Sequence, residues 1–215
     1  SLAGVVKELV EETRSVQGAV SRTRERLQQE QDEAHHLQSR VQELEAELQR
    51  LSAEVSTDQL TEVANRRGLI QAFDTEHARM QRSGRELSVG LLDIDNFKKL
   101  NDSLGHQTGD QALKFLAGSV KQALRPMDTV ARYGGEEFVV LLPETTTEEA
   151  SVVLTRLQRT LTASFFMHEN KQVFVTFSAG VTLYREGERL EETLDRADLA
   201  LYEAKRTGKN RTCIG

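Results

Sequence analysis

Residues 129–143 read TVARYGGEEFVVLLP, which is two apolar runs separated by Gly134-Gly135 and a pair of acids. Apolar runs joined by a Gly-Gly turn indicate a β-hairpin. We therefore expect strands over 129–133 and 138–142. The adjacent acids are not needed to form a hairpin, so the turn is also a candidate functional site.

Strands and helices are predicted on both sides of this hairpin. A helix is expected from Asn65 to about Gly84, and Pro126 and Pro143 are expected to end elements. The other expected strands are 87–94, 173–183 and 211–214, and the other expected helices are 96–104, 110–124, 147–161 and 190–206. Irregular alternation around one hairpin favours an α/β (α+β) sandwich with a mixed sheet.

The first 56 residues carry a different pattern. From Leu2 to Val55, apolar residues recur at alternating spacings of four and three, a period of 3.5 without proline. A sustained heptad repeat is typical of a coiled coil, and β-branched residues at one core position with leucines at the other favour a parallel pair. The rod would be about 80 Å long. We predict a coiled-coil dimerisation and signalling stalk over 1–56 and one folded domain over 57–215.

Three residues interrupt this heptad pattern, namely Thr13, Thr23 and Glu30. A glutamate at a core position lies against its twin in a parallel pair and costs stability. The interruptions are either tolerated variation or a soft segment that lets the rod change register, and the sequence leaves both interpretations open.

Composition limits the class of protein. The chain has 215 residues, 38% hydrophobic and 29% charged, with a net charge of −6. No apolar run reaches the roughly 18 residues of a membrane span, and an acidic chain has no general attraction for nucleic acid. The lone Cys213 excludes an internal disulfide and fits a reducing cytosol. We expect a cytoplasmic chain with no membrane segment and no nucleic-acid partner; because it begins with Ser, we also expect a fragment.

Polar clusters lie at the ends of three predicted elements. Asp93 and Asp95 end a strand and lead into a helix near Lys98, and Mg²⁺ typically takes one or two carboxylates while phosphate favours helix N-termini. Residues 134–137 combine glycines, which let a ligand approach the backbone, with two acids. Residues 205–209 supply cations at a helix end. Each cluster alone has a structural explanation, but together they are the parts of a Mg²⁺–nucleotide site.

The chain resembles the GGDEF family of diguanylate cyclases over about residues 57–215. The family motif stands here as Gly134-Gly135-Glu136-Glu137-Phe138, the GGEEF variant. Further matching blocks, in family order, are Thr57 to Thr61, Asn65 to Arg67, Asp93 to Asp95, Phe97-Lys98, Asn101-Asp102, Gly105-His106, Gly109-Asp110 and Ala197 to Lys205. The resemblance implies condensation of two GTP into cyclic di-GMP, with release of two pyrophosphates. It also implies a palm-like nucleotidyl-cyclase fold with a mainly antiparallel five-stranded sheet flanked by helices.

The resemblance further implies a metal and catalytic centre. Mg²⁺, or Mn²⁺, is expected at Asp93, the carbonyl of Ile94, Glu136 and Glu137, with Lys98 as a catalytic cation. Glu136 would complete the metal site or help to deprotonate the attacking ribose 3′-hydroxyl, and both roles stay open.

Substrate contacts are implied in the same way. Asn101 and Asp110 would hydrogen-bond guanine, and Lys98, Lys205 and Lys209 would neutralise the β- and γ-phosphates. Phe97, Gly134 and Gly135 complete the expected substrate-binding set. Lys209 occupies a position often held by arginine in the family. The lysine keeps the positive charge but cannot bind a phosphate in the bidentate geometry of an arginine.

A regulatory site is also implied. Arg125-Pro126-Met127-Asp128 matches the family's RxxD inhibitory site for cyclic di-GMP, and Arg156 stands at the offset of a further inhibitory arginine. The structural alternative for Arg125 and Asp128 is a helix-terminal ion pair.

One departure from the family pattern lies where the stalk meets the domain. The usual Leu-Thr-Gly-Leu is Leu60-Thr61-Glu62-Val63 here, so Glu62 replaces a glycine.

The implied chemistry explains the stalk, because two GTP-loaded domains must face each other and a parallel coil raises their effective concentration. The leading interpretation is an active homodimeric cyclase with signal input through the coil and product inhibition. The alternative is a catalytically inactive cyclic di-GMP-binding effector or a dimerisation module. Broken acids or lysines would favour that alternative, and none is broken in this sequence.

Overall fold

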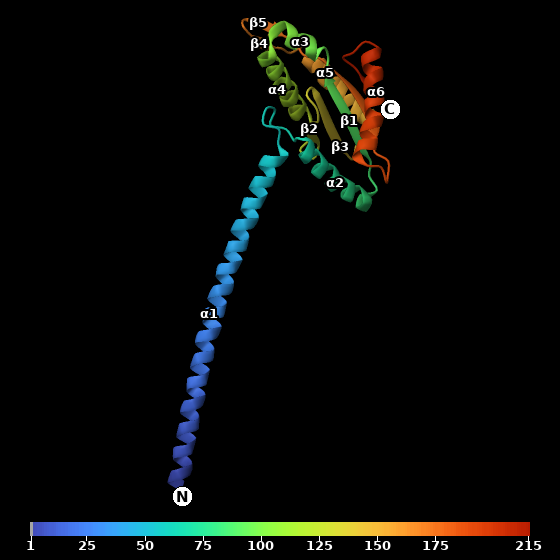
Figure 1. Cartoon of the computed structure of the whole chain (residues 1–215). Helices are drawn as coiled ribbons and strands as arrows, with labels where there is room; N and C mark the ends of the chain where they lie inside the picture. Colours follow the sequence, from blue (N-terminus) through green and yellow to red (C-terminus); the bar gives the residue numbers. More distant parts are fainter. Residues whose placement is uncertain (1) are drawn as a thin grey trace. The chain divides into compact units, whose positions relative to one another are not determined.

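The computed structural model describes residues 2–215, apart from the side chains of residues 49, 50 and 52–54 (Figure 1). The chain divides into two compact units, Ser1–Ala53 and Glu54–Gly215. The predicted boundary lies at residue 56, where the first helix ends.

Helix α1 (Leu2–Ser56) is one continuous helix of 55 residues, as the heptad pattern predicts. Its apolar stripe is open in the single chain: Leu9 is 57% exposed and Leu44 47%. In a stable protein such a long apolar stripe calls for a partner, because each buried leucine contributes about 2 kcal/mol. Pairing of two helices stays a prediction.

The residues that interrupt the stripe satisfy their polar groups within the helix. The hydroxyls of Thr13 and Thr23 donate to the carbonyl oxygens four residues earlier, at 2.6 and 2.9 Å. Glu30 accepts from Arg26 at 3.1 Å in an exposed ion pair. If Glu30 were packed in the core of a coiled coil, its carboxylate would lose part of its contact with solvent.

The second unit is built on a five-stranded sheet in the order β2-β3-β1-β6-β7. The central strand β1 (Leu87–Ile94) pairs antiparallel with β3 (Glu137–Pro143) and with β6 (Phe177–Leu183). At the edges, β2 (Thr129–Arg132) is antiparallel to β3 and β7 (Thr212–Ile214) is parallel to β6. The predicted mixed, mainly antiparallel five-stranded sheet is confirmed.

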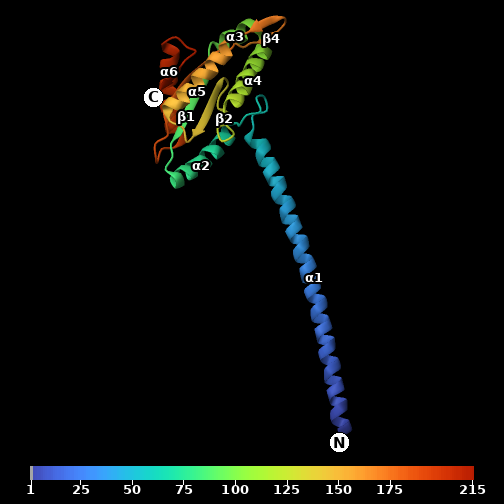
Figure 2. The same ribbon diagram turned by 180° about the vertical axis from the view of Figure 1, so that it is seen from behind.

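Helices cover both faces of this sheet (Figures 1 and 2). Helices α4 (His106–Ala123) and α5 (Thr147–Thr162) pack on one face, and α2 (Arg66–Ser83) and α6 (Leu190–Arg206) on the other. The short α3 (Phe97–Leu104) follows β1 directly. Because successive strand residues point to opposite faces, this arrangement decides which side chains of β1 and β3 meet which helices.

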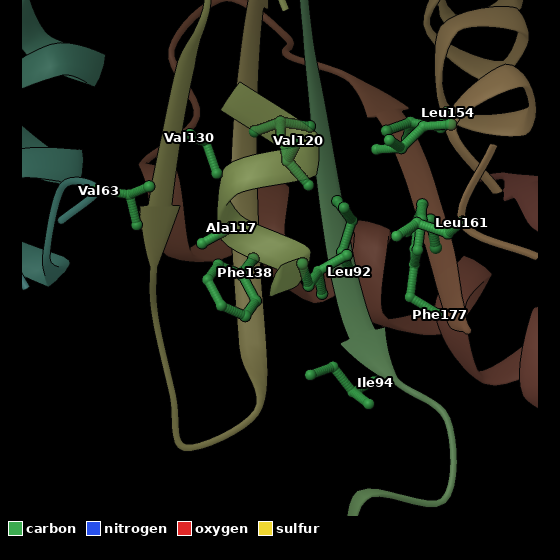
Figure 3. Close-up of a cluster of buried hydrophobic side chains, with 14 of the residues drawn as sticks. Val63, Leu92, Ile94, Ala117, Val120, Val130, Phe138, Leu154, Leu161 and Phe177 are labelled. Atoms are coloured by element: carbon green, nitrogen blue, oxygen red, sulfur yellow. The ribbon is translucent and has the colours of Figure 1, made fainter. Parts of the chain in front are cut away.

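The larger core lies between the sheet and helices α4 and α5. Leu92, Phe138 and Phe177 come from three neighbouring strands, and all three have no exposed surface (Figure 3). On the other face, Val89 and Val139 pack with residues of α2 and α6. The strand alternation is therefore strict through β1 and β3, which matters for the acids at their ends.

Helices α2 and α5 each begin at a residue whose side chain caps the helix. Asn65 accepts from the amide of Gly68 at 3.0 Å, and Thr146 forms a capping box with Glu149. Such caps satisfy amides that have no partner inside the helix.

Two expectations were wrong in detail. The strand expected over 173–183 is divided into β5 (Lys171–Val173) and β6, and β5 pairs with an unexpected strand, β4 (Phe166–His168). The turn of this second hairpin, Glu169-Asn170, has no glycine although both residues have positive φ, so no turn signal marked it. Helix α4 begins at His106 instead of 110, because Gly109 lies inside the helix and does not end it.

Candidate functional site

The ends of β1 and β3 bring two acids together. Asp93 pairs directly with Glu137 across the two antiparallel strands. Leu91 and Val139 precede and follow them by two residues and face α2 and α6, so both acids point to the α6 side of the sheet. Like charges in directly opposed positions repel, so folding alone does not explain this pair.

The glycine turn makes room for one of these acids. A Cβ on Gly134 would lie 2.4 Å from Oε2 of Glu137, whereas a Cβ on Gly135 would meet nothing within 4 Å. Gly134 thus creates a recess that the carboxylate of Glu137 fills, and Gly135 stays exposed.

Glu136 lies in the turn rather than in β3, which begins at Glu137. The rule that adjacent strand residues face opposite sides therefore does not apply to this pair. Both acids respond to the same neighbour, because burial and the charge of Asp93 raise the pKa of Glu136 and of Glu137. The two acids and Asp93 thus form one electrostatic cluster.

One cation lies inside the cluster. Lys205, from the last turn of α6, forms an ion pair of 2.9 Å with Asp93, whose side chain is 8% exposed. Burial raises the pKa of Asp93, the contact with Lys205 opposes this, and the charges of Asp95 and Asp198 add to it. With more acids than cations, the site has a surplus of negative charge that favours a cation.

The donor set fits a metal that is also held by a substrate. In the described part of the chain, no three His, Cys, Asp or Glu side chains form a metal cluster by themselves. Asp93, Glu136 and Glu137 are hard oxygen donors of the kind that Mg²⁺ prefers, and Mg²⁺ usually keeps positions for phosphate and water. The mutual repulsion of these three carboxylates fits such an ion, which would relieve it.

Asp95 has a structural task. Its carboxylate accepts hydrogen bonds from Ser178 at 2.6 Å, from Thr176 at 2.8 Å and from the amide of Asn210 at 3.0 Å. Asp95 therefore connects the segment after α6 with the ends of β1 and β6.

The predicted guanine-binding residues lie at the corner between α3 and α4, where Asn101 packs over Gly109, the neighbour of Asp110 in the chain. A Cβ on Gly109 would lie 1.9 Å from Oδ1 of Asn101, so only glycine leaves space for this side chain. That Oδ1 atom is buried and has no hydrogen-bond partner among the residues that the structure describes. Asp110 follows Gly109 and is exposed on the first turns of α4. A buried acceptor without a donor calls for a ligand or a water molecule.

The other predicted substrate residues differ in environment. Lys98 is exposed on the first turn of α3, and Phe97 is half-buried against the core under α4. Lys209 follows α6 and donates to Oδ1 of Asn96 at 2.6 Å. Phe97 therefore has a packing role, and Lys209 lies at the end of β1 with the acids.

The predicted inhibitory residues divide between two hollows. Arg125 and Asp128 form a reciprocal turn, with the amide of Arg125 donating to Asp128 at 2.8 Å, and they line a hollow of about 290 Å³. Burial raises the pKa of Asp128, opposed by the amide and the charge of Arg125. Arg156 lines a separate hollow of about 510 Å³ between α4 and α5.

Two residues near these sites were absent from the predicted set. Asp198 raises the pKa of Asp93 and Glu137 from α6, and Lys121 lines the hollow of Arg125. Helical spacing could have found both, because Asp198 precedes Lys205 by two turns and Lys121 precedes Arg125 by about one.

Residues 55–211 match the family model described as "Diguanylate cyclase, GGDEF domain". This chain belongs to the GGDEF family. The diguanylate cyclase DgcP of Pseudomonas aeruginosa is 39% identical over 205 residues, which are 95% of this chain and 30% of that relative. The chain thus spans less than a third of the length of this relative.

Solved GGDEF structures resemble the fold. The diguanylate cyclase SiaD from P. aeruginosa, solved with its activator SiaC, has a TM-score of 0.80 at 32% identity, covering 100% of this chain and 83% of that one. The coiled coil and GGDEF domain of DgcB from Caulobacter crescentus, solved with c-di-GMP, has a TM-score of 0.75 at 30% identity, covering 82% of this chain and 94% of that one. The predicted family and fold are confirmed.

Proposed function

We propose that this chain is a diguanylate cyclase that condenses two GTP molecules into cyclic di-GMP with release of two pyrophosphates. The observation that carries the proposal is the cluster of Asp93, Glu136, Glu137 and Lys205 beside the recess at Gly134. Nucleotidyl transfer needs acids for a divalent cation and cations for phosphate in one place. The relatives named diguanylate cyclases support the same activity.

Asp93, Glu136 and Glu137, with the carbonyl of Ile94, would hold Mg²⁺ or Mn²⁺. When bound, the ion neutralises phosphate charge and acts as a Lewis acid. Lys98, Lys205 and Lys209 would neutralise the β- and γ-phosphates, so that pyrophosphate becomes a better leaving group. At Gly135 a Cβ would meet nothing within 4 Å, so this part of the turn leaves the backbone open to the phosphates.

In each transfer step, the 3′-oxygen of one GTP attacks the α-phosphorus of the other. The bond from that phosphorus to the departing pyrophosphate breaks, and the 3′-hydroxyl proton passes to Glu136 or to water.

Guanine would bind at the corner between α3 and α4. The N–H groups on one edge of guanine match two acceptors, the unpartnered Oδ1 of Asn101 and the carboxylate of Asp110.

Two copies would associate through α1 as a parallel coiled coil that also transmits signals. One domain supplies one GTP, so a homodimer is needed for both attacks. The exposed apolar stripe of α1 supports this pairing. A tether replaces a bimolecular encounter by an effective concentration in the millimolar range.

Product inhibition would act through Arg125 and Asp128, with Arg156 as a further contact. The hollow at Arg125, with Lys121 beside it, offers cations for the phosphates of cyclic di-GMP. The cytosolic location inferred from the single cysteine stays a prediction. Among the described residues, no helix is both long enough and apolar enough to cross a bilayer.

The decisive experiment incubates the purified chain with GTP and Mg²⁺ and measures cyclic di-GMP by mass spectrometry. Glu136→Ala and Glu137→Ala should abolish turnover and leave the association state unchanged, whereas Glu186→Ala, an exposed residue beyond the other end of β6, should have full activity. Absence of product at micromolar protein would overturn the proposal. Binding of cyclic di-GMP without turnover would indicate the non-catalytic effector instead.

A further inference from the structure

The turn after β1 holds the segment that follows α6. Nζ of Lys209 donates to Oδ1 of Asn96 at 2.6 Å, although the residues are 113 positions apart. Next to this contact, the amide of Asn210 donates to Asp95 at 3.0 Å. Two adjacent residues of one loop are therefore fastened to two adjacent residues of the other.

Both partners of the first contact have unusual backbones. Asn96 has φ 58° and Lys209 has φ 61°, in the left-handed region. Asparagine tolerates this conformation, but a lysine in it is strained. Strain of this kind persists only where surrounding contacts enforce it, and it concentrates at functional sites.

Apart from suiting this left-handed backbone, the side chain of Asn96 has no other structural role among the contacts of the described residues. Asn96 stands at the N-cap position of α3, yet its side chain makes no capping hydrogen bond. Its carboxamide oxygen instead accepts the hydrogen bond from Lys209. Helix capping therefore does not explain why this residue is an asparagine.

We propose that Asn96 is a positioning residue, whose carboxamide holds the ammonium group of Lys209 at the end of β1 for the terminal phosphates of GTP. This inference rests on the proposed function. An ammonium has three N–H donors, so one bond to Asn96 leaves two for phosphate oxygens. A lysine is a point charge on a flexible stem, and a fixed acceptor compensates for the planar fork that an arginine would bring.

Asn96→Gly tests the proposal, because glycine adopts positive φ freely and only the carboxamide is lost. The KM for GTP should rise about fivefold, with kcat changed less than about twofold. Asn170→Gly is the matched control: it removes another asparagine at φ 61°, in the exposed β4–β5 turn, and should change neither constant.

A second measurement separates positioning from a general structural effect. Calorimetric binding of GTP should weaken about fivefold in Asn96→Gly, whereas binding of GMP, which lacks the β- and γ-phosphates, should stay the same. Adding Asn96→Gly to Lys209→Ala should cause no further loss, because the two residues act as one unit.

An unchanged affinity for GTP in Asn96→Gly, or an equal loss of GTP and GMP binding, would overturn the inference. Failure of the proposed function looks different, since the unmodified chain would then make no cyclic di-GMP. The comparison of GTP with GMP tests the role of Asn96 even in that case.

Discussion

Arg132 forms an ion pair with Asp58 across 74 residues: its Nη1 atom lies 3.4 Å from both carboxylate oxygens. The other nitrogen, Nη2, donates to the carbonyl of Gly135 at 2.8 Å. Asp58 also accepts from the amide and hydroxyl of Thr61. One guanidinium thus connects the turn at the start of the domain with the glycine turn of the candidate site.

Replacement of Arg132 by methionine should loosen both turns. The replacement removes the charged partner of Asp58. Because both side chains of the pair are about four-fifths buried, the free energy of unfolding should fall by about 2 kcal/mol. Cyclic di-GMP synthesis should fall as well, because Gly135 loses its anchor. Urea denaturation and a turnover assay check this, with exposed Arg82→Met on α2 as the control. Equal stability of the two variants would contradict it.

The same ion pair predicts a pH dependence. Burial raises the pKa of Asp58, but the hydrogen bonds from Thr61 and the charge of Arg132 outweigh burial, so its pKa lies below 3.8. A carboxyl whose pKa falls on folding stabilises the fold above its ordinary pKa, and this contribution disappears as the pH falls through the folded pKa. The stability difference between the unmodified chain and Asp58→Asn should therefore be larger at pH ~7 than at pH ~3. A difference that does not depend on pH would refute this assignment.

Glu62 has φ 57° at an exposed position where the family has glycine. A left-handed backbone costs a non-glycine residue about 1 kcal/mol, so Glu62→Gly should raise the free energy of unfolding by about that amount. Glu62→Ala keeps the strain and should not stabilise the domain. Thermal denaturation of both variants separates relief of strain from loss of a surface charge.

Gly109 and Gly118 lie on the same helix and form a matched pair. A Cβ on Gly109 would collide with Asn101, whereas a Cβ on Gly118 would meet nothing within 4 Å. Gly109→Ala should weaken GTP binding at least about tenfold by displacing a guanine acceptor. Gly118→Ala should leave binding unchanged and stabilise α4 by about 0.5–1 kcal/mol. Isothermal titration with GTP checks both, and equal affinities would exclude Asn101 from the guanine site.

Glu30 occupies a core position of the predicted coil, so Glu30→Leu should tighten dimerisation. Removing two opposed carboxylates and adding apolar surface should lower the dissociation constant about tenfold or more. Glu25→Leu makes the same change at an outward heptad position and should have little effect. Sedimentation equilibrium measures the dissociation constants of both variants. If regulation by an upstream input survives Glu30→Leu unchanged, the soft segment is not a switch.

Local patterns were sufficient for most of the fold. Apolar residues recur with a period of 3.5 in α1, about 3.6 in the domain helices and 2 in the strands. Such a period can be recognised because it depends only on residues that are neighbours in the chain. The hairpin β4–β5 was not predicted from the sequence, because its strands are short and its turn, Glu169-Asn170, lacks glycine. The sequence predicts a helix start at 110, after Gly109, because the space that this glycine leaves for Asn101 is a tertiary property.

For the candidate site, the order of residues along the chain is enough to show which residues are present, because acids, glycines and lysines at family spacing can be recognised there. The role of each residue depends on the packing of distant segments. Asp93 and Asp95 are equivalent in the sequence, yet strand register sets Asp93 opposite Glu137, while Asp95 is used to fasten the loop at Asn210. Register and long-range contacts depend on how distant segments pack, and no local pattern contains that information.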